Sequence, residues 1–361
     1  MKRTILLLLL MAVVAGPGCR TQQHGSHSTA SHFTPAESQL RLPAIFSDNM
    51  VLQQGMSVPV WGWAADNETV TVGFGSQEVT TKPRDGKWMV HLKNLKPGEP
   101  RTLTVKGFKT LQFTNVLVGE VWLCSGQSNM EWTLARSHEP DAAIANSRNP
   151  AIRLFQVPHT KAASPLPDIE GNRPQWREAS PESVPGFSAV GYYFGRELHR
   201  NLGVPIGLIQ STWGGSPAEV WMRREVLESE PRYQPVLEEH AKHWKNYETS
   251  LAQYERKREE ARRTGSKEKL TAPRAPWKPT ELYNGMIAPI VPYGIKGVIW
   301  YQGESNARRG TSVLYRELFP DLIRNWRSDW GQGDFPFLFV QLAPFKDIQQ
   351  YPSESDWAQL R

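Results

Sequence analysis

Short apolar runs before residue 116 alternate with polar positions and are separated by turn residues. This spacing over residues 42–115 predicts a small antiparallel β-sandwich with a hairpin-type turn at Asp85-Gly86. We interpret the region as a packing domain, and its tryptophans leave sugar binding as an alternative. The expected strands are residues 58–63, 69–74, 87–92 and 101–105.

From Val116 onward, longer apolar runs alternate with helical patterns. Alternating strands and helices predict an α/β domain with a parallel, doubly wound sheet. Residues 225–269 place aromatic side chains at helical spacing among Glu, Lys and Arg, which predicts an exposed helix or helical hairpin inserted into this domain. A lid or a partner surface is the functional alternative for that insertion. The expected strands are 116–123, 152–157, 204–210, 297–301 and a buried one at 335–340, with a helix at 191–201 that Gly203 ends.

The first residues have the pattern of an export signal. A basic start at Lys2-Arg3 precedes an apolar run that is too short to span a bilayer. Small residues then lead directly to Cys19, as in a bacterial lipoprotein processing site, and ordinary signal cleavage nearby is the alternative. We therefore expect a signal peptide over 1–19 with lipidation at Cys19, a flexible linker over 20–41, and a periplasmic, outer-membrane or secreted location.

Composition narrows the classes of function. The 361 residues are enough for two domains, and the formal net charge is +6. Most of the basic residues after the signal are interspersed with acidic ones, which favours a solvated face and argues against a nucleic-acid partner. If Cys19 carries lipid, Cys124 remains as a free thiol, which its apolar surroundings predict to be buried and inert.

Three predicted strands end in glycine-containing polar loops at residues 125–129, 213–216 and 302–306. In a parallel sheet these loops converge at the carboxyl edge, where open α/β sheets bind their ligands. The first loop offers the Ser128 hydroxyl, the second a glycine amide, and the third amide and carboxylate side chains. A nucleophile beside several oxyanion donors is what acyl transfer requires. The structural alternative is that Ser128 only caps the following helix.

The chain resembles the sialate O-acetylesterase family of the SGNH-hydrolase superfamily. The resemblance covers nearly everything after Leu42 and is most specific at residues 119–132, which contain Gly-Gln-Ser-Asn. Further matches lie at residues 46–53, 187–192, 211–216 and 300–306.

The resemblance implies an SGNH-like (flavodoxin-like) three-layer domain over 116–361 that hydrolyses acetyl esters on sugars or glycans without a metal or organic cofactor. It implies that Ser128 is the nucleophile, that the Gly215 amide and the Gln302 side chain bind the oxyanion, that Glu304 orients its loop, and that Asn306 assists. Sialate and plant polysaccharide such as xylan both remain open as substrates, and the oligomeric state is not predicted.

One part of the family pattern has no counterpart in this sequence. The family's general base is the histidine of an Asp-x-x-His motif near the end of the chain, and no Asp here is followed by His three residues later. His91, His138, His159 and His199 are not assigned as the base. We expect the catalytic domain to be incomplete at its C-terminal end and inactive as written, and a non-catalytic carbohydrate-binding lipoprotein is the alternative.

Overall fold

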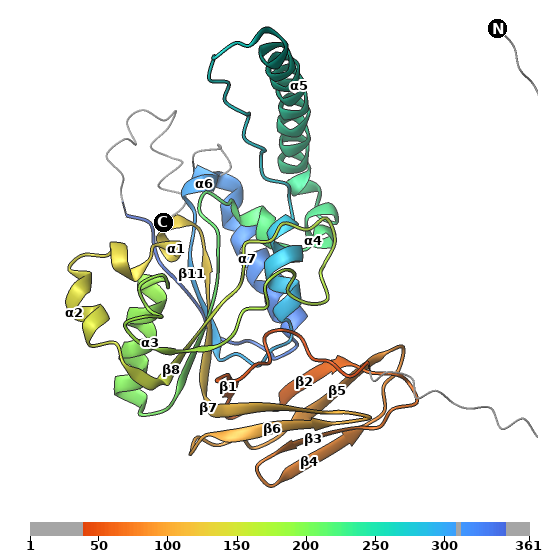
Figure 1. Cartoon of the computed structure of the whole chain (residues 1–361), viewed down its shortest axis with the longest axis vertical. Helices are drawn as coiled ribbons and strands as arrows, with labels where there is room; N and C mark the ends of the chain where they lie inside the picture. The colour runs from red at the N-terminus through yellow and green to blue at the C-terminus, as the bar shows by residue number, and fades with distance from the viewer. Residues whose placement is uncertain (1–38, 308–311, 344–361) are drawn as a thin grey trace, which may run out of the picture. The chain divides into compact units, whose positions relative to one another are not determined.

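A single long strand, β7 (Thr110–Gly126), links the two predicted regions in the computed structural model (Figure 1). Its first part pairs antiparallel with β6 (Arg101–Lys106), and from Glu120 onward it pairs parallel with β10 (Ile206–Thr212). The structure describes residues 39–307 and 312–343. The predicted signal peptide, Cys19 and most of the linker lie outside these described residues.

The β-rich part consists of two antiparallel ladders and the short β1, which pairs parallel with β7. One ladder joins β2 to β5, and the other joins β4, β3, β6 and β7 in that order. Along β5 every second residue is buried, as expected for a strand with one face on a core. Asp85 and Gly86 both have φ in the left-handed region, at 52° and 71°, which confirms the tight turn. The remaining strands here are β1 (Val51–Gln53), β2 (Val58–Trp63), β3 (Val70–Phe74), β4 (Gln77–Thr81) and β5 (Lys87–Leu92).

The predicted boundary at residues 115–116 falls inside β7. Buried side chains on both sides of it, such as Val60 and Val118, belong to one continuous hydrophobic cluster. The strands predicted at 58–63, 69–74, 87–92 and 101–105 are confirmed as β2, β3, β5 and β6. The division into a sandwich domain and an esterase domain stays a prediction.

The predicted parallel sheet is present in the second part. Its strands lie in the order β12, β11, β7, β10 and β8, all parallel, with the short β9 antiparallel at the edge. The bounds not yet given are β8 (Asn149–Gln156), β9 (Arg177–Ala179), β11 (Gly297–Tyr301) and β12 (Phe337–Phe339).

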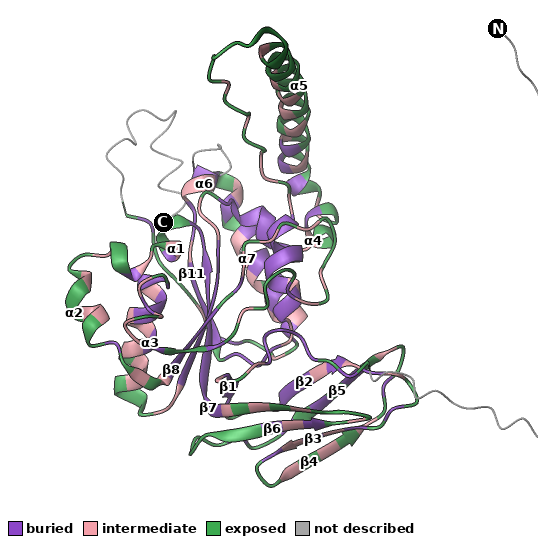
Figure 2. Ribbon diagram, viewed as in Figure 1, coloured by how far each residue is buried: buried purple, intermediate pink, exposed green. Residues whose placement is uncertain are grey.

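Helices cover both faces of this sheet, and the centre of the sheet is buried (Figures 1 and 2). Trp122 and Cys124 of β7 pack in the cluster that contains residues of α3 (Ala189–Leu202). The alternate residues, Val121 and Leu123, pack in the cluster that contains residues of α7 (Ser312–Trp330). Successive side chains of a strand point to opposite faces, so the near-continuous apolar run of β7 fits a strand buried on both sides.

The helix predicted at 191–201 is confirmed as α3, slightly longer than expected. The Ser188 hydroxyl accepts a hydrogen bond from the Gly191 amide at 3.0 Å, and Gly203 ends the helix with φ +66°. The other α-helices are α1 (Ser128–Glu131), α2 (Pro140–Ala145), α4 (Arg224–Glu228), α5 (Gln234–Thr264) and α6 (Glu304–Ala307), with short 3-10 or π segments at 134–136, 218–221, 231–233, 283–287 and 288–290.

The prediction of a buried strand at 335–340 is wrong. The strand there, β12, is short, and Leu338 and Phe339 are 48% and 62% exposed. Within the described residues β12 pairs only with β11, so it lies at the edge of the sheet. An apolar run predicts a strand but does not reveal whether another element covers its faces.

The charged insertion forms α4 and one long helix, α5, rather than a hairpin of two helices. Only Val236 and His240 are buried in α5, both near its start, and Figure 2 shows the remainder largely exposed. The described part of the chain has no helix with the length and apolar character that a membrane span requires.

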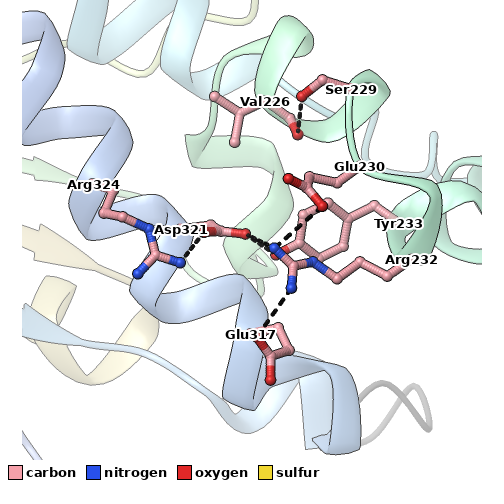
Figure 3. A network of polar contacts seen from close by, with 8 residues as sticks. All are labelled: Val226, Ser229, Glu230, Arg232, Tyr233, Glu317, Asp321 and Arg324. Atoms are coloured by element: carbon pink, nitrogen blue, oxygen red, sulfur yellow. Dashed lines mark hydrogen bonds and ion pairs between the residues drawn. The ribbon is translucent and has the colours of Figure 1, made fainter.

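Asp321 of α7 anchors the segment that leads into α5 (Figure 3). One carboxylate oxygen accepts hydrogen bonds from the Tyr233 hydroxyl at 2.5 Å and from Arg232 Nη2 at 2.9 Å. The other accepts from Arg324 Nε at 3.0 Å. Burial raises the pKa of Asp321, but the hydrogen bonds from Tyr233 and Arg324 and the two nearby positive charges outweigh it, so the pKa lies below its usual value.

Asp321→Asn is therefore expected to destabilise the fold by about 1–3 kcal/mol at pH 7, the range for hydrogen bonds to charged groups. A lowered carboxylate pKa contributes stability above about pH 4, and this contribution disappears as the pH falls through the lowered value. The difference between variant and wild type should thus shrink in acid. Urea unfolding at pH 7 and pH 3 measures it, with the exposed Asp334→Asn as control. A stability difference between Asp321→Asn and wild type that is the same at both pH values would contradict a stabilising role for the ionised Asp321 carboxylate.

Candidate active site

The three polar loops leave the sheet at the same level. Gly126, the last residue of β7, lies opposite Thr212 of β10 and Tyr301 of β11. The residues that follow, Gln127, Trp213 and Gln302, therefore emerge side by side at the carboxyl edge. The predicted convergence of the loops is confirmed.

Main-chain contacts at Gly126 and Gln127 join the loops. Gly126 has φ +139°, and a Cβ there would lie 2.2 Å from the Tyr301 carbonyl oxygen, so a side chain has no room. The Gln127 amide donates to that same oxygen at 3.0 Å, and the Trp213 amide donates to the Gly126 carbonyl at 3.1 Å. The Gln127 Oε1 accepts from the Ser305 amide at 3.2 Å. The first loop is thus bonded to both of the others.

Ser128 is the first residue of α1 and is exposed. The residue at the N-cap position is Gln127, and no side chain caps the helix, so the interpretation of Ser128 as a cap is wrong. The Ser128 hydroxyl makes no hydrogen bond within residues 39–307 and 312–343. A solvent-facing hydroxyl without a structural partner is available for chemistry.

The second loop brings Gly214 beside the nucleophile. A Cβ on Gly214 would lie 3.5 Å from Ser128 Cβ, so Gly214 is a close neighbour of Ser128. Its amide donates to the Glu131 carboxylate, one helical turn after Ser128. Gly215 has φ +75° and is exposed, and its carbonyl accepts from Trp277 Nε1 at 2.7 Å. Its amide has no acceptor within the described residues, as an oxyanion donor requires.

Gln302 is buried, and its side chain is fully engaged. Nε2 donates to the Ser216 carbonyl at 3.1 Å and to Asn306 Oδ1 at 2.7 Å, while Oε1 accepts from the Tyr315 hydroxyl at 2.9 Å. An amide nitrogen carries two hydrogens, and both have protein acceptors here. Its role as an oxyanion donor stays a prediction, and one of these two hydrogen bonds must open for it.

Glu304 and Asn306 hold the third loop. Glu304 Oε1 accepts from Asn129 Nδ2 at 2.6 Å and so connects the loop to the residue after the nucleophile. Asn306 is buried, accepts from the Ala218 amide at 3.0 Å, and donates to Glu219 Oε2 at 2.8 Å. Each side chain is therefore placed to hold neighbouring groups in position. For Glu304 this is the role that the resemblance implies.

His159 approaches the nucleophile helix, which no sequence pattern predicts. Its Nε2 lies 3.1 Å from Glu131 Oε1 and 2.9 Å from the Thr212 carbonyl, and its ring stacks on Trp213 at 4.2 Å. It also lines a hollow of about 470 Å³ together with Gln156 and Phe187. No contact joins His159 to Ser128 within the described residues, so we leave the base unassigned.

Cys124 lies one residue before the first loop but is completely buried. Burial alone raises the pKa of its thiol far above the usual range. The thiolate is the reactive form of cysteine, so Cys124 is a packing residue, as expected.

Comparison with known proteins identifies the family. Residues 118–253 and 271–359 match the family described as "Carbohydrate esterase, sialic acid-specific acetylesterase", and the unmatched gap falls on the far end of α5 and the loop after it. The chain is 34% identical to rat sialate O-acetylesterase over 84% of its own length and 60% of that protein. It is 32% identical to the human sialate O-acetylesterase over 89% of its own length and 60% of that protein.

Among solved structures, a carbohydrate acetylesterase from Xanthomonas citri is 38% identical, with a TM-score of 0.73 over 89% of this chain and 64% of that one. The chain thus spans about 60% of the length of the curated relatives it matches. The family match covers more than half of the chain and includes all three polar loops. The chain therefore belongs to the sialic acid-specific acetylesterase family of carbohydrate esterases.

Proposed function

We propose that this protein is a carbohydrate O-acetylesterase that hydrolyses acetyl esters on sugars with Ser128 as its nucleophile. The observation that carries the proposal is the exposed Ser128 hydroxyl, which has no hydrogen-bond partner among residues 39–307 and 312–343 and lies beside Gly214. Membership of a carbohydrate esterase family supports the same chemistry.

In this reaction Ser128 Oγ attacks the acetyl carbonyl carbon and passes its proton to a general base. The bond between the acetyl carbon and the sugar oxygen breaks, the sugar oxygen takes a proton, and an acetyl-serine ester remains. Water then attacks this ester, the bond between the acetyl carbon and Ser128 Oγ breaks, and Oγ takes back a proton as acetate leaves. The Gly215 amide, and Gln302 once one of its hydrogen bonds opens, would donate to the oxyanion in both steps. The base stays unassigned, because no imidazole of the described residues contacts Ser128.

The proposed substrate is an acetylated sugar or glycan. Sialate is the sugar named for the rat and human relatives, and we extend it to this chain as the first substrate to test. The product of the complete reading frame is incubated with O-acetylated sialic acid and with acetylated xylan, and released acetate is measured. We expect release from the sialate ester. Sugar binding without any release of acetate would contradict the esterase and favour a carbohydrate-binding protein.

We also propose that Cys19 is lipidated after export, since small residues directly precede it. Labelled fatty acid fed to expressing bacteria should attach to the wild-type protein and not to Cys19→Ser. Cys124→Ser keeps Cys19 and should retain the label, which makes it the matched control. Equal labelling of wild type and Cys19→Ser would refute the anchor.

A further inference from the structure

A buried ionisable pair lies beneath the candidate site. Glu219, in the 3-10 turn after the second loop, is 1% exposed, and His240 of α5 is 6% exposed. His240 Nε2 lies 2.9 Å from Glu219 Oε1. The reaction described above uses neither residue. Burying two ionisable groups is costly unless their hydrogen bonds are well made, so this pair needs an explanation.

The hydrogen bonds of the pair determine where its protons lie. His240 Nδ1 is 2.9 Å from the Trp277 carbonyl, which can only accept, so Nδ1 carries a hydrogen. Glu219 Oε2 accepts from Asn306 Nδ2. Burial raises the pKa of Glu219, but the hydrogen bond and charge of His240 and the bond from Asn306 outweigh it, and the pKa is lowered overall. Glu219 is therefore a carboxylate whose two oxygens face His240 Nε2 and Asn306 Nδ2.

One arm of this network reaches Gln302. Glu219 holds the Asn306 amide nitrogen, which leaves Asn306 Oδ1 directed at Gln302 Nε2, 2.7 Å away. An asparagine amide that turned around would present a nitrogen instead of an oxygen to Gln302. The Glu219 carboxylate and the Ala218 amide thus together select the orientation of Asn306, and Asn306 in turn orients Gln302.

The other arm reaches Gly215. His240 Nδ1 donates to the main-chain carbonyl of Trp277, and the indole Nε1 of Trp277 donates to the Gly215 carbonyl at 2.7 Å. This hydrogen bond holds Gly215 through its carbonyl and leaves the Gly215 amide available to donate to an oxyanion. The pair therefore connects to the second and third loops through separate chains of hydrogen bonds.

We propose that Glu219 and His240 form a positioning pair that holds both predicted oxyanion donors, Gly215 and Gln302, in place at once. Its value for catalysis rests on the proposed esterase function. The pair also gives the base of the inserted helix α5 a role in the site, because His240 is one of the two residues that α5 buries.

The first test compares Glu219→Ala with Glu219→Gln in acetate release by the product of the complete reading frame. Loss of an oxyanion donor lowers kcat by about 10²–10³-fold, so misplacing the two donors in Glu219→Ala should lower kcat by at least about 10-fold with KM changed less than about twofold. Gln can accept from Asn306 and donate to His240, so Glu219→Gln should stay within about threefold of wild type. A Glu219→Gln variant as slow as Glu219→Ala, or a Glu219→Ala variant as fast as wild type, would overturn the proposal.

The second test does not depend on activity. Hydrogen exchange should become faster in Glu219→Ala over residues 213–217 and 302–306, and remain unchanged over β8. Trp277→Phe removes the indole hydrogen bond to Gly215 and keeps an aromatic ring beside Trp213. Exchange should then rise over 213–217 and not over 302–306, which provides a result even if Glu219→Ala does not fold. Unchanged exchange at both loops would overturn the positioning role while the esterase proposal stands. If exchange is faster in Glu219→Ala but the wild-type protein releases no acetate, the esterase proposal fails and the positioning role of the pair stands.

Discussion

Ser128→Ala is expected to lower acetate release from an activated acetyl ester by about 10⁴–10⁶-fold, the range found when a nucleophilic serine is removed. The hydroxyl supplies the bond to the acetyl group, and no neighbouring side chain in the described residues can replace it. Since Ser128 is exposed and its hydroxyl has no hydrogen bond there, stability should change by less than about 0.5 kcal/mol.

The matched control is Ser76→Ala, which removes another exposed serine hydroxyl in the turn between β3 and β4. It should leave both acetate release and the melting temperature as in wild type. Turnover retained by Ser128→Ala at the wild-type rate would refute the assignment of the nucleophile.

Gly126→Ala should have the second largest effect and should act on both stability and activity. Gly126 has φ +139°, where side chains are strained, and a Cβ would lie 2.2 Å from the Tyr301 carbonyl oxygen. That oxygen also accepts the Gln127 amide, so relief of the clash must separate β7 from β11 and move the nucleophile loop. We expect the free energy of unfolding to fall by about 2–6 kcal/mol, the sum of backbone strain and overpacking, and acetate release to fall by at least about 10²-fold.

Gly203→Ala distinguishes the effect of backbone strain from the effect of the steric clash. Gly203 also has a positive φ, +66°, but nothing lies within 4 Å of its Cβ position. It should cost only about 1 kcal/mol and leave activity unchanged. Thermal unfolding and acetate release measure both variants. A Gly126→Ala variant no less stable than Gly203→Ala would show that the close approach of the two strands is unimportant.

Local patterns predicted most of the strands and the main helix. Alternation along β5, the Asp85-Gly86 turn, and the cap signals at Ser188 and Gly203 each depend on residues close in sequence. Glycine-containing loops after apolar strands also predicted the convergence of 125–129, 213–216 and 302–306, because parallel strands end at a common edge.

The contacts within the site could not be predicted in the same way. Glu219 and His240 are 21 residues apart, on different elements, and their pairing depends on how α5 begins beside the sheet. A signal existed for His240, which occupies the same helical stripe as Val236 and Trp244 among charged residues. Glu131 and His159 meet only because β8 and β7 both pair with β10.

The sequence by itself determined most of the strands, the parallel α/β class, the family and the choice of Ser128 as the candidate nucleophile, because these depend on local patterns and on a specific motif. Tertiary structure decided that β12 is an exposed edge, that α5 is one helix, and that Gln302 is tied to Ser216 and Asn306. Exposure and hydrogen-bond partners depend on which distant segments pack together, and neither periodicity nor a motif encodes that packing in any one stretch of chain.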